Sequence, residues 1–124
     1  NVSTEKTFSS ASRILNLGGL ADVEVGRGVT IEHSPNDASH IHGSDGMGNL
    51  SKQLPDPIHN YKTARYSDEI LIDRLNTTPG EITLIAIAPL TNLAAAEKKQ
   101  PGILRKAKEI IIMGGAFHCS GNVT

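Results

Sequence analysis

The chain has 124 residues and a mass of 13.2 kDa, which is enough for one ordinary domain and too little for two. Lys and Arg number 12 against 13 Asp and Glu, so the net charge of −1 excludes a polybasic protein that binds nucleic acid or a membrane surface. Hydrophobic residues make up 38%, as in soluble globular proteins, and no apolar run approaches the roughly 20 residues that cross a bilayer.

The single cysteine, Cys119, has no internal partner, so no disulfide framework is expected. A reducing compartment is the default for such a chain, and we therefore predict a cytoplasmic location. The chain begins with Asn1 and not with methionine, which leads us to expect a processed, trimmed or fragmentary polypeptide.

A first helix is predicted near the start of the chain. Ser3 or Thr4 suits its N-cap, and Glu5 lies in the first turn, where the helix dipole favours a negative charge. Apolar residues follow at helical spacing: Phe8, Ala11, Ile14 and Leu15. Gly18 ends the helix. Two short β-prone runs are then predicted at residues 23–25 and 29–31.

Residues 32–66 are predicted to form a long irregular loop. They contain four of the five histidines and almost no hydrophobic periodicity. A loop of this length is uncommon in a compact domain unless it is a functional lid or is disordered. We therefore expect an active-site type of loop here.

The second half of the chain alternates between helix and strand. Ser67 is predicted to cap a helix, and a second, Ala-rich helix is predicted over residues 90–97. Continuous apolar runs at residues 82–88 and 109–113 are typical of strands buried on both faces of a parallel sheet. This order predicts an α/β fold with an open parallel sheet, in which ligands bind at the carboxyl ends of the strands.

The most distinctive local pattern is His40-x-His42 before a glycine-rich turn. Two histidines one residue apart, with His33 or Asp45 as a third ligand, are one possible metal site, although the spacing matches no strong zinc signature. The glycines equally favour a mobile loop whose backbone approaches a ligand, or a plain surface loop. The residues alone leave these readings open.

The carboxyl-terminal segment offers a further polar candidate. Gly114-Gly115 follows an apolar strand but lacks the spaced third glycine of a dinucleotide fingerprint. Asn122 carries an amide that can donate and accept hydrogen bonds toward a polyhydroxylated ligand, and it is equally compatible with an ordinary turn.

Taken together, four stretches in order make the chain similar to the nucleoside hydrolase family, the inosine–uridine-preferring nucleoside N-ribohydrolases. These stretches are NVSTEKT at residues 1–7, HIHGSDGMG at residues 40–48, ITL with APLTNLA at residues 82–84 and 88–94, and IIMGGAF with GNVT at residues 111–117 and 121–124. Each is weak alone, but their order over nearly the whole chain makes the resemblance specific.

The resemblance implies an open, mostly parallel, Rossmann-like sheet and hydrolysis of the N-glycosidic bond of ribonucleosides to ribose and free base. It also implies a Ca²⁺ ion that binds the ribose hydroxyls and the attacking water, which suits a hard cation with oxygen ligands. The family's Asp-rich signature, its general-base Asp and its leaving-group His have no counterpart in this segment. No catalytic residue is therefore expected within it.

The resemblance assigns roles to single positions. Asn1 and Asn122 match asparagines at the ribose pocket, and Met113 lies next to that pocket. His42 matches a loop histidine on the nucleobase side, and Ile87 matches the position whose backbone carbonyl ligates Ca²⁺. The Asn122 match depends on a small gap after Phe117.

We therefore expect residues 1–124 to be the central part of a nucleoside hydrolase domain, which forms homo-oligomers at full length and is inactive as this segment alone. The alternative is a non-catalytic truncated module that associates with another chain, since its apolar strands would leave sheet edges without neighbours.

Overall fold

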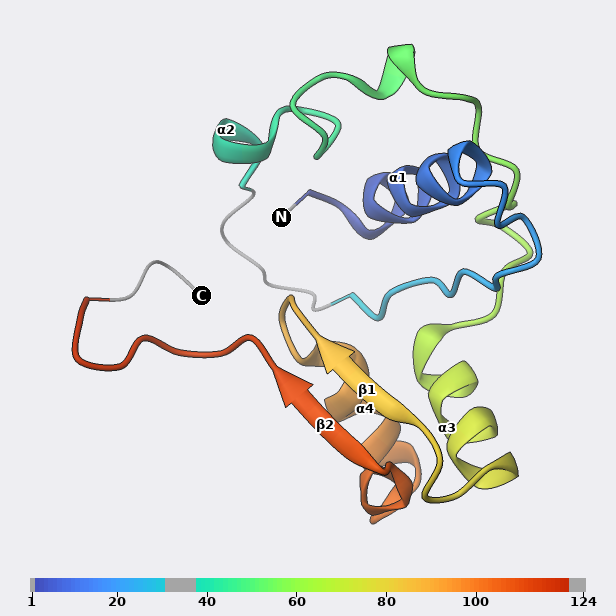
Figure 1. The fold of residues 1–124 in the computed structure, drawn as a ribbon, viewed down its shortest axis with the longest axis vertical. Helices are drawn as coiled ribbons and strands as arrows, with labels where there is room; N and C mark the ends of the chain where they lie inside the picture. Colours follow the sequence, from blue (N-terminus) through green and yellow to red (C-terminus); the bar gives the residue numbers. More distant parts are fainter. Residues whose placement is uncertain (1, 31–37, 121–124) are drawn as a thin grey trace. The chain divides into compact units, whose positions relative to one another are not determined.

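The computed structural model describes residues 2–30 and 38–120 of the chain (Figure 1). The chain divides into two compact units, Asn1–Ser67 and Asp68–Thr124, and each is described by itself. The expectation that residues 1–124 form one partial domain stays a prediction. No helix within the described residues is long and apolar enough to span a membrane.

The first unit is built on helix α1, Thr4–Leu17. Ser3 is its N-cap, with the Ser3 hydroxyl accepting a hydrogen bond from the Lys6 amide, and Gly18 is its C-cap. These ends confirm the predicted helix. Its buried residues are Phe8 and Ser12, so one of the two side chains that the helix buries is polar.

The described residues that follow α1 in the first unit are mostly irregular, with two short helical segments. A four-residue helix α2, Ser39–His42, and a 3-10 turn η1, Ser51–Gln53, lie within the described part of the predicted long loop. The predicted strand at residues 23–25 is wrong. Residues 29 and 30 are not in a strand either, and residue 31 lies outside the described residues. The nearest β-type contact is an isolated parallel bridge of Arg27 with Tyr66, in which the Arg27 amide donates to the Arg65 carbonyl and the Arg27 carbonyl accepts from the Ser67 amide.

The second unit contains the predicted sheet. Its elements are, in order, α3 Ser67–Thr77, β1 Thr83–Ala86, α4 Thr91–Lys99, η2 Ile103–Lys106 and β2 Glu109–Ile112. Strands β1 and β2 pair in parallel, with Ile85 opposite Ile111. The strand–helix–strand order and the parallel pairing confirm the α/β fold class with an open parallel sheet.

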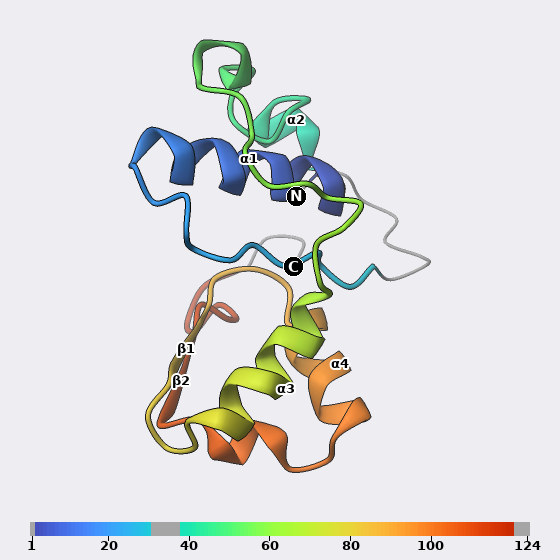
Figure 2. The ribbon, with the colours of Figure 1, turned by 90° about the vertical axis from the view of Figure 1, so that its right-hand side faces the viewer.

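The core of the second unit lies between the sheet and its helices. Leu75, Ala96 and Ile103 are fully buried, and Leu84 of β1 packs against them. Figure 2 shows α3 and α4 on the same side of the two strands. Full burial of a Leu or Ile side chain stabilises the folded state by about 1.5–3 kcal/mol, so Leu75 and Ile103 hold the helices to the sheet.

The opposite face of the sheet is exposed within the described residues. Ile85 is 67% exposed and Ile111 is 50% exposed. The prediction that both strands are buried on both faces is therefore wrong for this structure. The reason is that side chains alternate along a strand, and the described helices cover only the side that carries Leu84 and Ala86.

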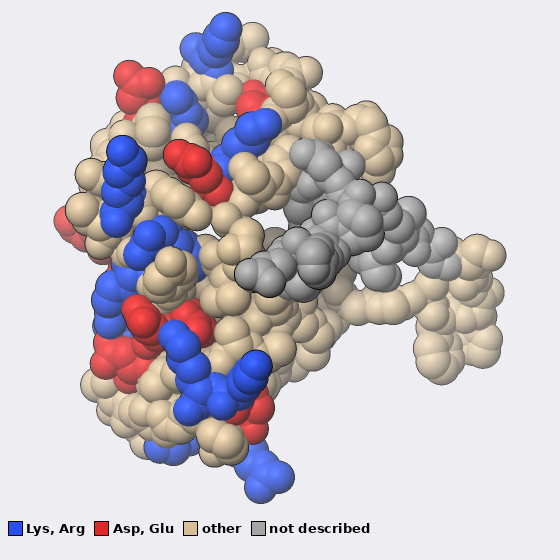
Figure 3. Space-filling model, turned by 180° about the vertical axis from the view of Figure 1, so that it is seen from behind, with Lys and Arg blue, Asp and Glu red and all other residues tan. Residues whose placement is uncertain are grey.

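Charged side chains of both signs are mixed on the face of the molecule that Figure 3 shows. In the space-filling view, Lys and Arg side chains lie among Asp and Glu side chains rather than forming a region of one sign (Figure 3). This distribution agrees with the nearly balanced composition.

Candidate functional site

Two of the sequence-predicted site residues meet at the carboxyl end of the sheet. The Met113 amide donates a 2.8 Å hydrogen bond to the carbonyl oxygen of Ala86, which continues the parallel ladder one residue beyond β2. This register places Ile87 beside Met113. Both side chains are largely exposed, at 67% and 68% respectively.

The backbone carbonyl of Ile87, one residue beyond β1, makes no backbone hydrogen bond to β2. The carbonyls of Ile82 and Ala86 accept hydrogen bonds from Lys108 and Met113 of the neighbouring segment. Carbonyls of successive strand residues alternate in direction, so we expect the Ile87 carbonyl, if the alternation continues past Ala86, to face the other edge of β1. Among the described residues no donor is hydrogen-bonded to it. An oxygen with this orientation is available to bind a ligand or a hard cation.

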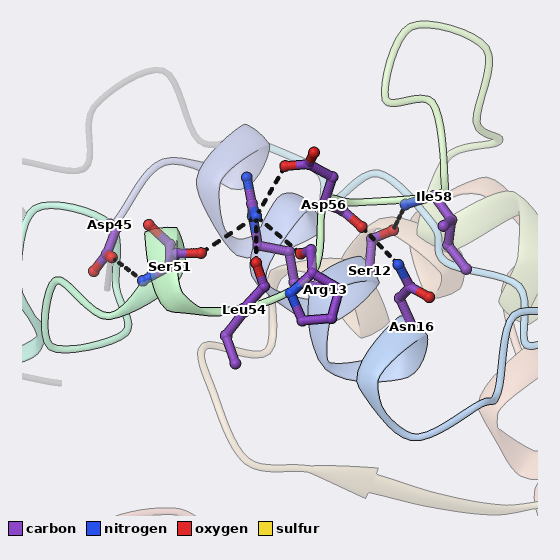
Figure 4. A network of polar contacts seen from close by, with 9 residues as sticks. Ser12, Arg13, Asn16, Asp45, Ser51, Leu54, Asp56 and Ile58 are labelled. Atoms are coloured by element: carbon purple, nitrogen blue, oxygen red, sulfur yellow. Dashed lines mark hydrogen bonds and ion pairs between the residues drawn. The ribbon is translucent and has the colours of Figure 1, made fainter.

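In the first unit, two polar side chains of α1 bond the backbone of residues 51–56 and hold this segment against the helix. Nη1 of Arg13 donates to the carbonyl oxygens of Ser51, Leu54 and Pro55 at 3.2, 3.4 and 2.9 Å. Nδ2 of Asn16 donates to the Asp56 carbonyl at 2.9 Å. Figure 4 shows these side chains reaching from one helix to the same stretch of backbone. The helix thereby satisfies carbonyl groups that an irregular segment would otherwise leave to water.

Ser12 fixes the neighbouring stretch and the tautomer of a histidine. Its fully buried hydroxyl oxygen accepts hydrogen bonds from the amides of Ile58 and His59 at 3.0 and 2.9 Å. Its own proton is then donated to Nδ1 of His59 at 2.8 Å. Neutral His59 must therefore carry its proton on Nε2. The ring borders a hollow of about 400 Å³ that is also lined by Glu5 and Tyr61.

His42 lies at the end of α2 and is exposed. Its carbonyl oxygen accepts a 2.7 Å hydrogen bond from the Gly48 amide, which closes the chain into a compact loop. Asp45 lies inside this loop. Hydrogen bonds from the backbone amides of Ser51, Met47 and Asn49 hold the pKa of the Asp45 carboxyl far below its ordinary value of 3.8.

The role suggested for Asp45 as a third metal ligand is wrong. Both of its carboxylate oxygens are occupied by backbone amides, and the described residues contain no group of three His, Cys, Asp or Glu side chains that could hold a metal ion. His40 and His42 are exposed, and His33 lies outside the described residues.

The remaining predicted site residues stand as follows. Ile87 and Met113 are brought together within the second unit, and His42 belongs to the first unit. Asn1 and Asn122 lie outside the described residues. The roles of these five residues in binding sugar, base or metal stay predictions.

The sequence interpretation missed the residues that organise the His42 loop. The sequence pattern suggests Asp45 only as a possible metal ligand and gives no signal for Lys6 or Ser10. For Asp45 a signal exists: an aspartate before a glycine often accepts hydrogen bonds from backbone amides a few positions ahead. The partners of Lys6 and Ser10 are backbone carbonyls, which every residue has, so no pattern marks them.

Comparison with known proteins agrees with this architecture. A family model described as inosine-uridine preferring nucleoside hydrolase matches residues 1–124. A probable uridine nucleosidase 2 of Oryza sativa subsp. japonica is 37% identical over 127 residues, which cover 100% of this chain and 37% of that protein. The inosine-uridine preferring nucleoside hydrolase of Leishmania major is 35% identical, with 100% of this chain and 40% of that protein covered.

The solved structure of a plant nucleoside hydrolase, PpNRh1, superposes with a TM-score of 0.83 at 38% identity over 98% of this chain and 38% of that one. The chain thus spans about two fifths of the length of the curated relatives that it matches. Since the family model extends over every residue, the chain belongs to the inosine-uridine preferring nucleoside hydrolase family.

Proposed function

We propose that this protein hydrolyses the N-glycosidic bond of ribonucleosides and releases ribose and a free base. The observation that carries the proposal is the family match over residues 1–124, together with relatives named as uridine nucleosidases and as an inosine-uridine preferring hydrolase. The meeting of Ile87 and Met113 at the carboxyl end of the sheet supports it, because ligands bind at that edge in open α/β sheets.

We propose one role for each residue that the family resemblance singles out. In the proposed complex Asn1 and Asn122 hydrogen-bond the ribose hydroxyls and Met113 packs beside the sugar. His42 lies on the side of the nucleobase. A site that hydrogen-bonds hydroxyl groups discriminates strongly against substrates that lack them, because its polar groups are then left unpaired.

The Ile87 carbonyl fits one position of a Ca²⁺ site, since it is a backbone oxygen without a donor among the described residues. Ca²⁺ takes about six to eight oxygen ligands, so this carbonyl needs further oxygens from elsewhere, and we propose that these 124 residues alone do not hydrolyse nucleosides. A bound Ca²⁺ would lower the pKa of the attacking water. The contribution of this chain would be to direct an oxygen toward the ion.

The test is the release of base from uridine and inosine by the protein expressed from the complete reading frame that contains these residues, hereafter the reading-frame product. Asn122→Ala should lower kcat/KM for uridine by about 10- to 100-fold, the value of a lost hydrogen bond to the sugar. Asn76→Ala is the matched control, because Asn76 bonds Gln100 at the end of α3. Equal losses in the two variants would contradict the assignment of Asn122, and a wild type that releases no base would contradict the proposed function.

A second candidate function rests on the exposed face of the sheet. Ile85, Ile87, Ile111 and Met113 are each at least half exposed, and β1 and β2 have no further strand beside them among the described residues. Such a face favours a non-catalytic module that pairs with another chain. The coding sequence on either side of residues 1–124 separates the two candidates. An adjoining Asp-rich strand signature favours the enzyme, and immediate start and stop codons favour the module.

We also propose that the reading-frame product forms homo-oligomers and resides in the cytoplasm. The single Cys119 supports the second statement, because a chain without a possible internal disulfide suits a reducing compartment.

A further inference from the structure

Residues 42–51, the His42 loop, form a closed ring of backbone. The Gly48 amide bonds the His42 carbonyl at 2.7 Å, and the Gly46 amide bonds the Gly43 carbonyl at 3.0 Å. Gly43 has a φ of 79°, and a Cβ atom there would lie 2.7 Å from the Asn49 backbone nitrogen. The ring is thus too tight for any other residue at this position.

The carboxylate of Asp45 fills the centre of this ring. Its Oδ1 accepts hydrogen bonds from the amides of Met47 and Asn49, each at 2.8 Å, and its Oδ2 accepts one from Ser51 at 2.9 Å. A charged acceptor makes these bonds stronger than neutral ones. Three donors converge on two oxygens, so an asparagine at this position would turn its NH₂ group toward at least one amide.

The loop is also fixed to α1. Nζ of Lys6 donates to the Ser44 carbonyl at 2.7 Å, and Oγ of Ser10 donates to the Asp45 carbonyl at 3.3 Å. Gly46 approaches Val2 so closely that an added Cβ would lie 2.7 Å from a Val2 methyl group. Asp45 therefore joins the inner bonds of the loop to the helix on which the loop rests.

The imidazole of His42 is the side chain of this loop that is available to contact a ligand. It is exposed, and no hydrogen bond of its side chain joins it to a described residue. Its backbone, by contrast, is fixed through the Gly48 bond. A fixed backbone that carries an exposed imidazole limits the positions that the ring can take, which lowers the entropy lost when it contacts a ligand.

We infer that Asp45 is a positioning residue for nucleobase recognition: its carboxylate orders the His42 loop on α1 and so sets where the His42 imidazole meets the base. The inference rests on the proposed function, in which His42 lies on the nucleobase side. It adds that base recognition depends on an aspartate that touches neither base nor sugar.

The structural half of the inference is tested by hydrogen exchange on the reading-frame product. Asp45→Asn should speed exchange at the amides of Met47, Asn49 and Ser51 by at least tenfold. Glu97→Gln is the matched control, because Glu97 likewise accepts backbone amides, those of Gly102 and Leu104, in the second unit. Unchanged protection of the loop amides in Asp45→Asn would overturn the inference whatever the enzyme does.

The functional half compares two leaving groups. Asp45→Asn should lower kcat/KM for uridine by about 10- to 100-fold, through a higher KM, because the contact with the base is misplaced. The value of kcat/KM for p-nitrophenyl riboside, which presents no base edge, should change less than threefold. Glu97→Gln should leave the ratio of kcat/KM for uridine to kcat/KM for p-nitrophenyl riboside at the wild-type value. Equal losses on both substrates would show a merely structural role and overturn the inference.

A double-mutant cycle then joins the two residues. If Asp45 acts through His42, the variant with both Asp45→Asn and His42→Ala should be no worse on uridine than His42→Ala alone. Multiplicative losses would overturn the inference. If the wild type hydrolyses neither substrate, the proposed function is wrong. The hydrogen-exchange experiment then still tests whether Asp45 orders the His42 loop.

Discussion

The Met113 amide donates a 2.8 Å hydrogen bond to the carbonyl oxygen of Ala86, and this bond sets the geometry of the carboxyl edge of the sheet. It extends the pairing beyond Ile112 and brings Ile87 beside Met113, where the Ile87 carbonyl has no backbone donor among the described residues. The predicted metal ligand and the predicted neighbour of the sugar thus depend on one backbone hydrogen bond.

Met113→Pro removes this donor, while Met113→Leu keeps it. The Met113 side chain is 68% exposed, so the leucine variant should change the free energy of unfolding by less than about 0.5 kcal/mol. The proline variant should lose about 1–2 kcal/mol, because the Ala86 carbonyl is left without its partner. Urea unfolding of the reading-frame product measures both, and equal stability of the two variants would contradict the importance of the bond.

Ser12→Ala should destabilise the first unit by about 1–3 kcal/mol. Ser12 is fully buried, and its loss leaves the amides of Ile58 and His59 without an acceptor. Ser9→Ala on the same helix is the control, since no hydrogen bond of the Ser9 side chain joins it to a described residue. A urea midpoint for Ser12→Ala equal to that of Ser9→Ala would refute the role given to the hydroxyl.

The His42 loop should resist acid. Backbone amides, that of Ser51 foremost, hold the pKa of Asp45 below its ordinary value of 3.8. A lowered pKa in the folded state means that the stabilisation is present above the unfolded value and is lost as the pH falls through the folded value. The NMR shift of the Ser51 amide should therefore stay constant from pH 7 to about pH 4, and a titration midpoint near 3.8 would be inconsistent with this account.

Lys99→Met should lower the urea midpoint, whereas Lys98→Met should not. Nζ of Lys99 lies 2.8 Å from the carboxylate of Asp68, which is 3% exposed, so its removal leaves a buried charge unpaired. Lys98 is exposed and has no ion pair with a described residue. Identical urea midpoints would contradict this and would show that the ion pair, like most surface pairs, contributes little to the free energy of unfolding.

The same ion pair has an alkaline signature. Hydrogen bonding to Asp68 raises the pKa of Lys99 above its ordinary value of 10.5. A raised pKa in the folded state means that the contribution is complete below 10.5 and is lost as the pH rises through the folded value. The difference in the free energy of unfolding between wild type and Lys99→Met should therefore persist at pH 10 and shrink only above the ordinary lysine pKa of 10.5.

Much of the fold was predictable because its signals are local. The Ser3 cap and Glu5 mark the start of α1, and the apolar runs at residues 82–88 and 109–113 contain the two paired strands. The fold class and the meeting of Ile87 with Met113 follow from strand order, since parallel strands end at one edge.

The ordering of the His42 loop and the segment after it was not predictable, because it depends on contacts between distant residues. Arg13 bonds the carbonyl of Ser51, which lies 38 positions along the chain, and carbonyls have no sequence signature. The role of Asp45 has no specific sequence signature for the same reason, since its partners are backbone amides. The exposed face at Ile85 could not be foreseen, because an apolar run does not tell which of its faces the neighbouring helices cover.

The most direct test of the central claim is the identity of the products formed from uridine by the reading-frame product. The account predicts free uracil and free ribose in equal amounts, at a rate that does not depend on phosphate, falls on chelation of divalent cations and returns with added Ca²⁺. Intact uridine after prolonged incubation, or ribose 1-phosphate formed only when phosphate is present, would contradict it.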